Sequence, residues 1–539
     1  MRHFPTSRGL LIPLLGLLLW VATPLGAQAD TGAFDEALSL ILDRSFPKKE
    51  QAIERFLDSG DPRAEPLLRA LLIGEFYTRK ADGEPVLAVP GDGSRFQAVR
   101  SSADLGPIDK AELSRVTINN NMRTRLKGAL AELSLAHPDP ARRLAAVREL
   151  QTNLTPEQRP LLEKLAAKDT SPPVAEALAQ ALALLDLDHP EAGTRLAAVH
   201  HLEASLTPVV RAGLTRLLGQ EPDPAVKKAA QRALQGIELR VKVYSAAETL
   251  FFGLSLGSVL VLAAIGLAIT FGVMGVINMA HGELIMLGAY TTYVIQLALP
   301  DQITYSLLLA VPAAFLVSGL TGVLIERGLI RFLYGRPLET LLATFGLSLV
   351  LQQLVRSVFS PLNRSVETPA WMSGSWQLNE VLSLTLNRLY ILVFCLAVFA
   401  ALYLVLKRTR LGLQVRAVAQ NRAMAQAMGV RSAWVDAMTF GLGSGIAGVA
   451  GVALSQLTNV GPNLGQAYII DSFMVVVFGG VGNLWGTLVG GLGLGVVSKL
   501  LEPWSGAVLA KILVLVLIIL FIQKRPRGLF PQKGRAADS

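Results

Sequence analysis

Cysteine and charge are the scarcest features of this sequence. Cys395 is the single cysteine in 539 residues and lies in an apolar run, which excludes an internal disulfide or a cysteine-based metal site. Charged residues make up only 17% of the chain, whereas hydrophobic residues make up 51%. This balance excludes an ordinary soluble protein and predicts a membrane protein with room for a separate soluble domain.

Acidic residues are scarce in one half of the chain. Residues 1–244 hold 31 Lys and Arg against 30 Asp and Glu, whereas residues 245–539 hold 19 against 11. The formal charge of +9 therefore belongs almost entirely to the second half. Basic residues collect in the cytoplasmic loops of membrane proteins, so this excess indicates membrane topology and not nucleic-acid binding.

The N-terminal residues 1–29 have the pattern of a secretory signal peptide. Arg2 and Arg8 form the positively charged segment before an apolar stretch at residues 9–21, and Ala27-Gln28-Ala29 supplies the small residues of a cleavage site. An uncleaved first membrane anchor is the alternative. Both interpretations place the following segment, up to about residue 240, outside the cytoplasm.

A repeat with a spacing of 52 residues runs through residues 137–234. HPDPARRLAAVREL (137–150) recurs as HPEAGTRLAAVHHL (189–202), and DTSPPVAEALAQAL (169–182) recurs as EPDPAVKKAAQRAL (221–234). Proline near each start, followed by Ala, Leu and Val at helical spacing, predicts helix pairs that stack into an α-solenoid. The repeats resemble HEAT repeats, and residues 30–240 are expected to form an exported, periplasmic helical-repeat domain.

Two features of this domain need separate interpretation. Residues 76–107 contain Gly, Pro and short apolar runs, which predict a small hairpin or loop insertion. The histidines of the repeats raise the question of a metal site, but two precede proline at helix starts and two are adjacent, so capping or surface roles are favoured. These histidines are His137, His189, His200 and His201.

The second half contains apolar segments long enough to cross a bilayer. Basic loops and a predicted cytoplasmic C-terminus, combined with an exported N-terminus, require an odd number of spans. The expected fold is therefore all-α, a helical membrane domain of about nine spans preceded by the exported helical repeats. The expected spans are about 249–271, 283–299, 303–325, 338–359, 388–406, 435–456, 469–482, 485–499 and 505–523.

Polar residues inside these apolar segments mark a candidate translocation path. They fall in GVMGVINMAHGELIMLGAY (272–290) and in the glycine-rich residues 441–497. Ionisable groups at membrane depth are costly and usually face a cavity or a partner. The alternative is that His281 and Glu283 lie at a membrane interface and that the glycines serve only close helix packing. The candidates are Asn278, His281, Glu283, Asp471, Asn483 and Trp485.

The loop at residues 407–431 carries six basic residues and no acidic one. Its middle, residues 415–429, is rich in Ala, Met and Gln, which predicts a helix that ends at Gly429. Ala417, Met424 and Met428 fall on one side of this helix and form a small apolar stripe where a partner could dock. An ordinary cytoplasmic loop is the alternative.

Three of these segments together resemble one family. The sequences INMAHGELIMLGAY, RAVAQNRAMAQAMGV and FGGVGNLWGTLVGG look like the permease subunits of branched-chain amino-acid-type ABC importers. The stretch from Thr439 to Thr487 is most similar to the urea-transport branch of that family. The resemblance covers residues 249–530, and the exported extension before it does not carry over from the family.

The resemblance implies an inner-membrane subunit that works with a second permease subunit, two cytoplasmic ATPases and a periplasmic solute-binding protein. It implies a transporter subunit, not an enzyme, with no cofactor, and the sequence has no G-x-x-x-x-G-K-[ST] phosphate loop. By position, residues 415–429 correspond to the family's ATPase-coupling helix. Its candidate contact residues are Arg416, Ala417, Gln420, Asn421, Met424, Ala425, Met428 and Gly429.

The resemblance to the urea-transport branch makes urea the expected solute. Few charges are available within the spans to bind the ammonium and carboxylate groups of an amino acid, which also favours an uncharged solute. A branched-chain amino acid or a short amide is the alternative within the same class. A passive urea channel would need similar pore chemistry but no docking helix. A membrane-anchored scaffold built around the solenoid would need no polar groups within its spans.

Overall fold

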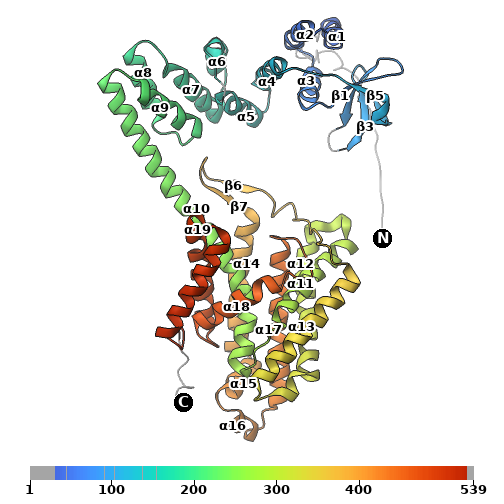
Figure 1. Ribbon diagram of the computed structural model, residues 1–539, viewed down its shortest axis with the longest axis vertical. Coiled ribbons are helices and arrows are strands. Elements are labelled where there is room, and N and C mark those ends of the chain that lie inside the picture. Colours follow the sequence, from blue (N-terminus) through green and yellow to red (C-terminus); the bar gives the residue numbers. More distant parts are fainter. Residues whose placement is uncertain are drawn as a thin grey trace, which may run out of the picture. The chain divides into compact units, whose positions relative to one another are not determined.

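The computed structural model describes residues 31–530 except 44, 90, 91, 102, 136 and 153. The expected signal peptide, residues 1–29, lies outside the described residues. The chain divides into two compact units, Met1–Gln235 and Gly236–Ser539. We describe each unit by itself, with its elements labelled as in Figure 1.

The first unit begins with four helices around a small apolar core. They are α1 (Thr31–Ile41), α2 (Phe46–Ser59), α3 (Ala64–Ile73) and α4 (Asn120–Leu135). Phe34, Phe56, Leu67, Leu68 and Met122 are fully buried between them. These apolar residues recur at helical spacing, so each helix turns one stripe toward the shared core.

A five-stranded antiparallel sheet separates α3 from α4, so the unit is not all-α. The predicted hairpin or loop insertion is larger than residues 76–107, because the edge strand β5 pairs with β1 through Arg115 and Tyr77. Its inner face buries Val86, Phe96 and Leu113. The short strands were not distinguishable from a loop because their apolar alternation lasts only a few residues. The strands, in the order β4-β3-β2-β1-β5, are β1 (Phe76–Arg79), β2 (Pro85–Val89), β3 (Asp92–Ala98), β4 (Asp104–Pro107) and β5 (Leu113–Arg115), the last preceded by η1 (Lys110–Glu112).

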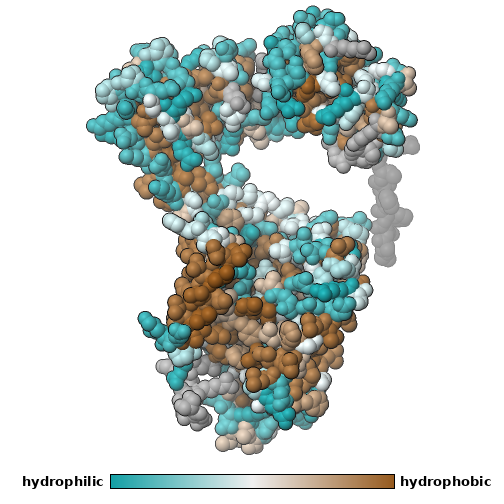
Figure 2. All heavy atoms as spheres, viewed as in Figure 1, coloured by the Kyte–Doolittle hydropathy of each residue, from teal (hydrophilic) through white to brown (hydrophobic). Residues whose placement is uncertain are grey.

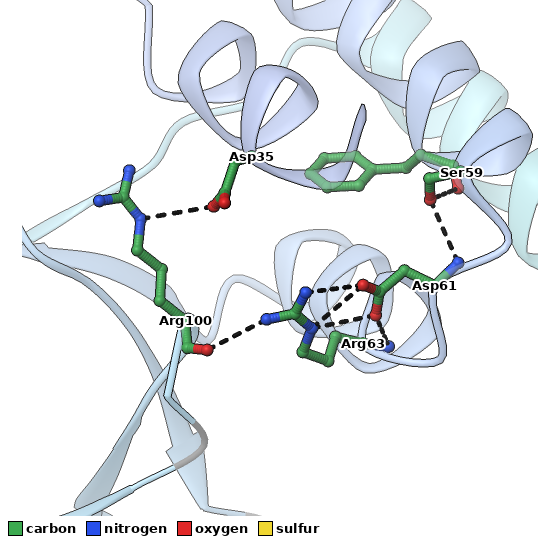
Figure 3. A network of polar contacts seen from close by, with 6 residues as sticks. Asp35, Ser59, Asp61, Arg63 and Arg100 are labelled. Atoms are coloured by element: carbon green, nitrogen blue, oxygen red, sulfur yellow. Dashed lines mark hydrogen bonds and ion pairs between the residues drawn. The ribbon is translucent and has the colours of Figure 1, made fainter. Parts of the chain in front are cut away.

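Arg63 connects the start of α3 to the turn that follows β3 (Figure 3). Its Nη2 donates to Oδ2 of Asp61 over 2.7 Å, its Nη1 donates to the carbonyl of Arg100 over 3.0 Å, and its guanidinium lies 4.2 Å from the ring centroid of Phe34. The hydrogen bonds from Arg63 lower the pKa of Asp61 below its usual range. One arginine thereby ties a helix start, a loop and an aromatic core residue together.

The rest of the first unit consists of helices in the region of the 52-residue repeat. They alternate with short loops that begin or end at proline, which pre-sets the backbone for a first helical turn. The helices are α5 (Pro140–Gln151), η2 (Pro156–Gln158), α6 (Arg159–Ala166), α7 (Pro172–Asp186), α8 (Ala192–Leu202), α9 (Pro208–Gln220) and the start of α10 (Pro224–Met274).

The two copies of the repeat make the same polar contacts. Arg143 forms a bidentate ion pair with Asp169, and its counterpart Arg195 forms one with Glu221. Each arginine also donates to the backbone carbonyls of the His-Pro pair that precedes its helix. The rings of His137 and His189 in turn accept a backbone N–H two residues ahead. Each histidine therefore binds the N–H of the residue just before a helix, Asp139 or Glu191, and is not itself the helix cap.

The second unit is a bundle of helices with one two-stranded ribbon, β6 (Ser375–Gln377) and β7 (Ser383–Thr385). Apolar side chains cover much of its surface in Figure 2. Its helices are α10, α11 (His281–Ala298), η3 (Pro300–Gln302), α12 (Ile303–Gly328), η4 (Ile330–Leu333), α13 (Pro337–Phe359), α14 (Leu386–Arg408), α15 (Arg410–Gln420), α16 (Arg422–Ala427), α17 (Ser432–Ser455), α18 (Gln466–Gly479) and α19 (Leu484–Lys524).

The predicted count of nine spans is not confirmed. Among the described residues, six helices are long and apolar enough to cross a membrane: α10, α12, α13, α14, α17 and α19. The helix α18 has only 14 residues. The two segments predicted at 485–499 and 505–523 both belong to α19, where they meet at a kink at Gly506, whose φ is 75°. The backbone at Gly506 is non-helical, so α19 consists of two helices joined at this kink, and the two predicted segments remain distinct.

Glycines bring the central helices of this unit into close contact. A Cβ atom at Gly448 of α17 would lie 2.5 Å from the carbonyl oxygen of Ala314 in α12. A Cβ atom at Gly451 would clash with the carbonyl of Ile285 in α11. Small residues at such crossings let helix backbones approach, and α17 is consequently buried along nearly its whole length.

Candidate translocation site

The backbone between α10 and α11 is non-helical within the core of the membrane unit. Asn278 lies in this break, is 1% exposed, and accepts the N–H of Ala280 through its side-chain oxygen over 3.0 Å. Thr344 of α13 accepts the N–H of Met279 over 3.1 Å. Irregular backbone at membrane depth is tolerated only where protein groups or a water-filled cavity satisfy it. Asn278 therefore helps to stabilise a break between helices.

His281 opens α11 and binds the preceding helix. The side chain is fully buried, and its Nε2 donates to the carbonyl of Ala263 in α10 over 2.8 Å. Within the described residues, Nδ1 has no hydrogen-bond partner. This contact positions α11 against α10.

Glu283 is the centre of a buried polar cluster that joins three helices. Its Oε1 accepts from Ser348 Oγ over 3.0 Å, from Gln352 Nε2 over 2.8 Å and from Gln466 Nε2 over 2.8 Å. Ser348 and Gln352 belong to α13 and Gln466 to α18. Glu283 is 0% exposed, and its Oε2 has no hydrogen-bond partner among the described residues. One carboxylate oxygen is thus saturated with donors while the other can accept a further N–H or O–H group.

Two partners of Glu283, Ser348 and Gln352, form part of a polar stripe along α13 that the sequence interpretation missed. Its members recur every four residues and so share one helix face. Four of its five members are buried, and the fifth, Arg356, donates to Asn463 Oδ1 over 2.8 Å. At 1.5 Å per residue the stripe is about 24 Å long, comparable with the apolar core of a bilayer. The signal in the sequence was the recurrence of polar residues every four positions within an apolar span. The stripe consists of Thr340, Thr344, Ser348, Gln352 and Arg356.

Asn483 and Trp485 lie apart from Glu283, in the wall of a cavity of about 700 Å³. The ends of α10 and α14, the start of α19 and the loop helix α15 enclose this cavity, and Arg416 contributes to it. Asn483 caps α19 by accepting the N–H of Gly486 over 3.2 Å. Trp485 is 51% exposed and contacts the rings of Phe399 and Tyr403. Only Asn483 and Trp485 of the six path candidates line it.

Asp471 lines a different cavity of about 300 Å³. Its carboxylate pairs with Lys511 of α19 at 3.3 Å, and Arg388 of α14 lies in the same wall. The six predicted residues therefore occupy three places: the break with its polar cluster, the large cavity and this smaller one. The three candidates at the break before α11 lie close together. Asp471 of α18 lines the smaller cavity, whereas Asn483 and Trp485, at the start of α19, line the large one.

The predicted coupling helix at residues 415–429 is two helices. Helix α15 ends at Gln420 and α16 begins at Arg422, because the Asn421 side chain accepts the N–H of Met424 over 2.9 Å and caps a new helix. Asparagine competes with helix continuation in this way. Gly429 has a φ of 84°, the left-handed conformation expected of a glycine that ends a helix.

The predicted ATPase-contact residues of this loop divide between surface and interior. Met424 and Met428 are 61% and 78% exposed, as a docking surface requires. Ala425, in contrast, is 6% exposed and packs with Val415, Val418 and Val435 inside the chain. Ala417 packs partly against the same cluster, whereas Arg416 and Gln420 are exposed. The surface available to a partner therefore centres on the two methionines.

Comparison with known proteins identifies the membrane unit. Residues 249–522 match the family described as branched-chain amino acid transport system / permease component. The permease protein LivH of the high-affinity branched-chain amino acid transport system of Salmonella typhimurium is 31% identical over 292 residues, which are 52% of this chain and 94% of that protein. The corresponding protein BraD of Pseudomonas aeruginosa is 31% identical over 298 residues, covering 53% and 96%.

A more distant relative and the solved structures complete the comparison. The ribose import permease protein RbsC of Escherichia coli K12 is 25% identical over 252 residues, which are 45% of this chain and 74% of that protein. No solved structure matches the chain significantly. Because the family match spans half of the chain and the relatives are covered almost completely, the chain belongs to the family of permease components of branched-chain amino acid transport systems.

Proposed function

We propose that this chain is a permease subunit of an inner-membrane ABC importer whose solute is urea. The observation that carries the proposal is the buried cluster around Glu283, in which Ser348, Gln352 and Gln466 are all uncharged donors. Family membership supports the transport class, with a second permease subunit, cytoplasmic ATPases and a solute-binding protein as partners. Membrane lipid surrounds the exposed apolar helices.

The cluster offers the hydrogen bonds that a neutral diamide needs. Urea carries four N–H donors and one carbonyl acceptor, and Glu283 Oε2 is free to accept from an N–H group. The amide groups of Gln352 and Gln466 can donate to a carbonyl when the cluster rearranges around a solute. A site built to satisfy buried polar groups discriminates strongly against solutes that leave them unpaired.

A branched-chain amino acid is the second candidate, and one observation favours it. Arg356 lies one helical turn beyond Gln352 on the polar stripe of α13, so Glu283 and Arg356 provide one charge of each sign. A zwitterion could place its ammonium group at Glu283 and its carboxylate at Arg356. The names of LivH and BraD refer to branched-chain amino acids, which agrees with this candidate.

The large cavity provides a physical link from the loop to the path. Val415, Arg416 and Ala419 of α15 form one wall of the cavity, and Asn483 and Trp485 form another. If the ATPases hold the exposed surface around Met424 and Met428, their closure would move α15 and change the size of this cavity. Alternating opening of the path would follow from that movement.

Radiolabelled uptake by the complete transporter in liposomes tests the solute. We expect ATP-dependent uptake of urea and none of leucine. Glu283→Gln keeps the size of the side chain and one acceptor oxygen and removes its charge, so urea uptake should fall by less than about tenfold. Glu339→Gln makes the same chemical change at a residue of α13 that is 55% exposed in its side chain, and serves as the control.

The amino-acid candidate predicts the opposite result. Leucine would then be carried, and Glu283→Gln would abolish its uptake because the ammonium group loses its counter-charge. Urea uptake without ATP, in the membrane subunits alone, would instead identify a passive channel.

A further inference from the structure

Arg422 joins the coupling loop to the core of the membrane unit. It is the first residue of α16, and its Nη2 donates to Oδ2 of Asp436 on α17 in an ion pair. The side chain of Asp436 is 0% exposed, whereas that of Arg422 is 39% exposed. Among the basic residues of the 407–431 loop that the structure describes, only Arg422 forms an ion pair with a carboxylate.

A second buried carboxylate lies next to this ion pair. The guanidinium carbon of Arg422 is 4.6 Å from the ring centroid of Tyr334, and the Tyr334 hydroxyl donates to Oε1 of Glu326 over 3.3 Å. Glu326 belongs to α12 and its side chain is 0% exposed. The side chains of Arg422, Asp436, Tyr334 and Glu326 form what we term the coupling joint, which links α16 to both α12 and α17.

The joint leads to the candidate translocation site through close helix packing. Gly448 of α17 approaches the backbone of α12 at Ala314, and Gly451 of α17 approaches the backbone of α11 at Ile285. Helix α11 carries Glu283, two residues before Ile285. Because backbones packed this closely leave no space to absorb a displacement, a shift of α17 also shifts α11.

A buried carboxylate resists separation from its cation. If α16 moved away from α17, Asp436 would lose Arg422 and leave an uncompensated charge in the protein interior, which is strongly unfavourable. We propose that the coupling joint makes α12 and α17 follow the movement of α16, with Arg422 as a positioning residue. This inference rests on the proposed role of α15 and α16 as the contact with the ATPases.

Transport stoichiometry tests the joint in the complete transporter in liposomes. In Arg422→Gln we expect the ATPases to co-purify as in wild type and ATP hydrolysis to continue, while uptake per ATP hydrolysed falls about tenfold, within the range typical of coupling between sites. Arg422→Lys keeps the charge and should recover part of the ratio. Arg408→Gln removes an exposed basic residue at the end of α14 and should leave the ratio unchanged.

A distance measurement tests the joint without reference to the solute. The chain has one cysteine, Cys395, which is buried, so spin labels can be introduced selectively at Ala423→Cys on α16 and Leu324→Cys on α12. Both positions are exposed, and neither is one of the candidate ATPase contacts. The joint predicts a distance distribution that keeps its width between the nucleotide-free and ATP-trapped states, and that broadens when Arg422→Gln is added.

Each outcome decides for or against the joint. A wild-type ratio of uptake to hydrolysis in Arg422→Gln, or an unbroadened distance distribution, would overturn it. Loss of co-purifying ATPase would show that Arg422 is a docking contact and not an internal joint. If Arg422→Gln does not accumulate, Arg422→Lys replaces it, and its ratio must fall while co-purification is kept. Failure of urea uptake alone would refute the proposed solute but would leave the distance result standing.

Discussion

At the scale of single residues, Glu283 and Asp471 differ although both are acidic groups on membrane helices. Glu283 is fully buried and accepts three hydrogen bonds from neutral groups. Asp471 is paired with Lys511, whose side chain is 63% exposed. A half-exposed ion pair contributes only about 0–1 kcal/mol, so Asp471 is available for a role other than stability.

Alanine substitutions should separate these two roles. Glu283→Ala leaves Ser348 and Gln352 without the acceptor that Glu283 provides, while Gln466 keeps only its bond to Ser348 Oγ. Each buried group left unsatisfied costs about 1–3 kcal/mol, so both membrane abundance and uptake should fall. Asp471→Ala should keep normal abundance and lower uptake. Immunoblots of membranes and uptake per transporter provide the measurement. Unchanged uptake in Asp471→Ala would remove the 300 Å³ cavity from the path.

The loop residues allow a test that distinguishes docking from folding. Met428→Asp places a charge on an exposed surface, so the loop should fold normally, while co-purifying ATPase and uptake are lost. Ala425→Asp places a charge among buried valines, where an unpaired charge costs several kcal/mol, so the loop itself should be disordered. Limited proteolysis of the loop in purified membranes separates the two. A Met428→Asp variant that still binds ATPase at wild-type levels would contradict the docking surface.

At the scale of elements, α17 connects the parts of the membrane unit. It packs on α11 and α12 through glycines and receives the ion pair from Arg422. Gly448→Ala would place a Cβ atom 2.5 Å from a backbone oxygen of α12, and such overpacking costs about 1–3 kcal/mol. We expect a lower thermal unfolding temperature in detergent. Gly493→Ala in α19 is the matched control, because a Cβ atom there meets no atom within 4 Å.

The repeated ion pairs of the first unit predict a loss of its stability in acid. Hydrogen bonds from Arg143 lower the pKa of Asp169, and those from Arg195 lower the pKa of Glu221. A carboxyl group whose pKa is lower in the folded than in the unfolded state stabilises the fold at pH values above its unfolded pKa. This contribution disappears as the pH falls through the pKa of the folded state. The free energy of unfolding of residues 137–235 should therefore decrease below about pH 4.

Hydrogen exchange of the full-length chain at pH 7 and at pH 3, corrected for intrinsic rates, measures this decrease. The double variant Arg143→Gln, Arg195→Gln lacks the cause of both pKa shifts. Its repeats should be less protected at pH 7 and should lose less protection in acid. An equal loss in variant and wild type would assign the acid sensitivity to other groups.

At the scale of the whole molecule, the two compact units suggest two separable parts. Protease added outside spheroplasts should remove residues 30–240 and leave a protected core of residues 249–539. Deletion of residues 30–240, with the export signal kept, should leave a membrane core that still accumulates, because its own helices and glycine contacts hold it together. A protected repeat domain would place it in the cytoplasm, and an unstable core would show that the units depend on one another.

The sequence by itself determined the local features of this protein. Apolar length set most of the membrane helices, proline and periodicity set the helices of the repeat region, and Gly429 set a helix end. The family followed from short motifs, and a relative that is 31% identical over 94% of its length agrees with it. Each of these features depends on residues that are neighbours along the chain, so a linear pattern is enough to specify it.

Only the tertiary structure decided which side chains meet. Glu283 and Gln466 are 183 residues apart, and their contact exists because α11, α13 and α18 pack together. The same applies to Ala425, which faces inward because Asn421 starts a new helix, and to Arg422, which reaches Asp436 only after the chain turns back. The direction of a side chain depends on how its helix is rotated against neighbours from distant parts of the chain, and long-range packing sets that rotation.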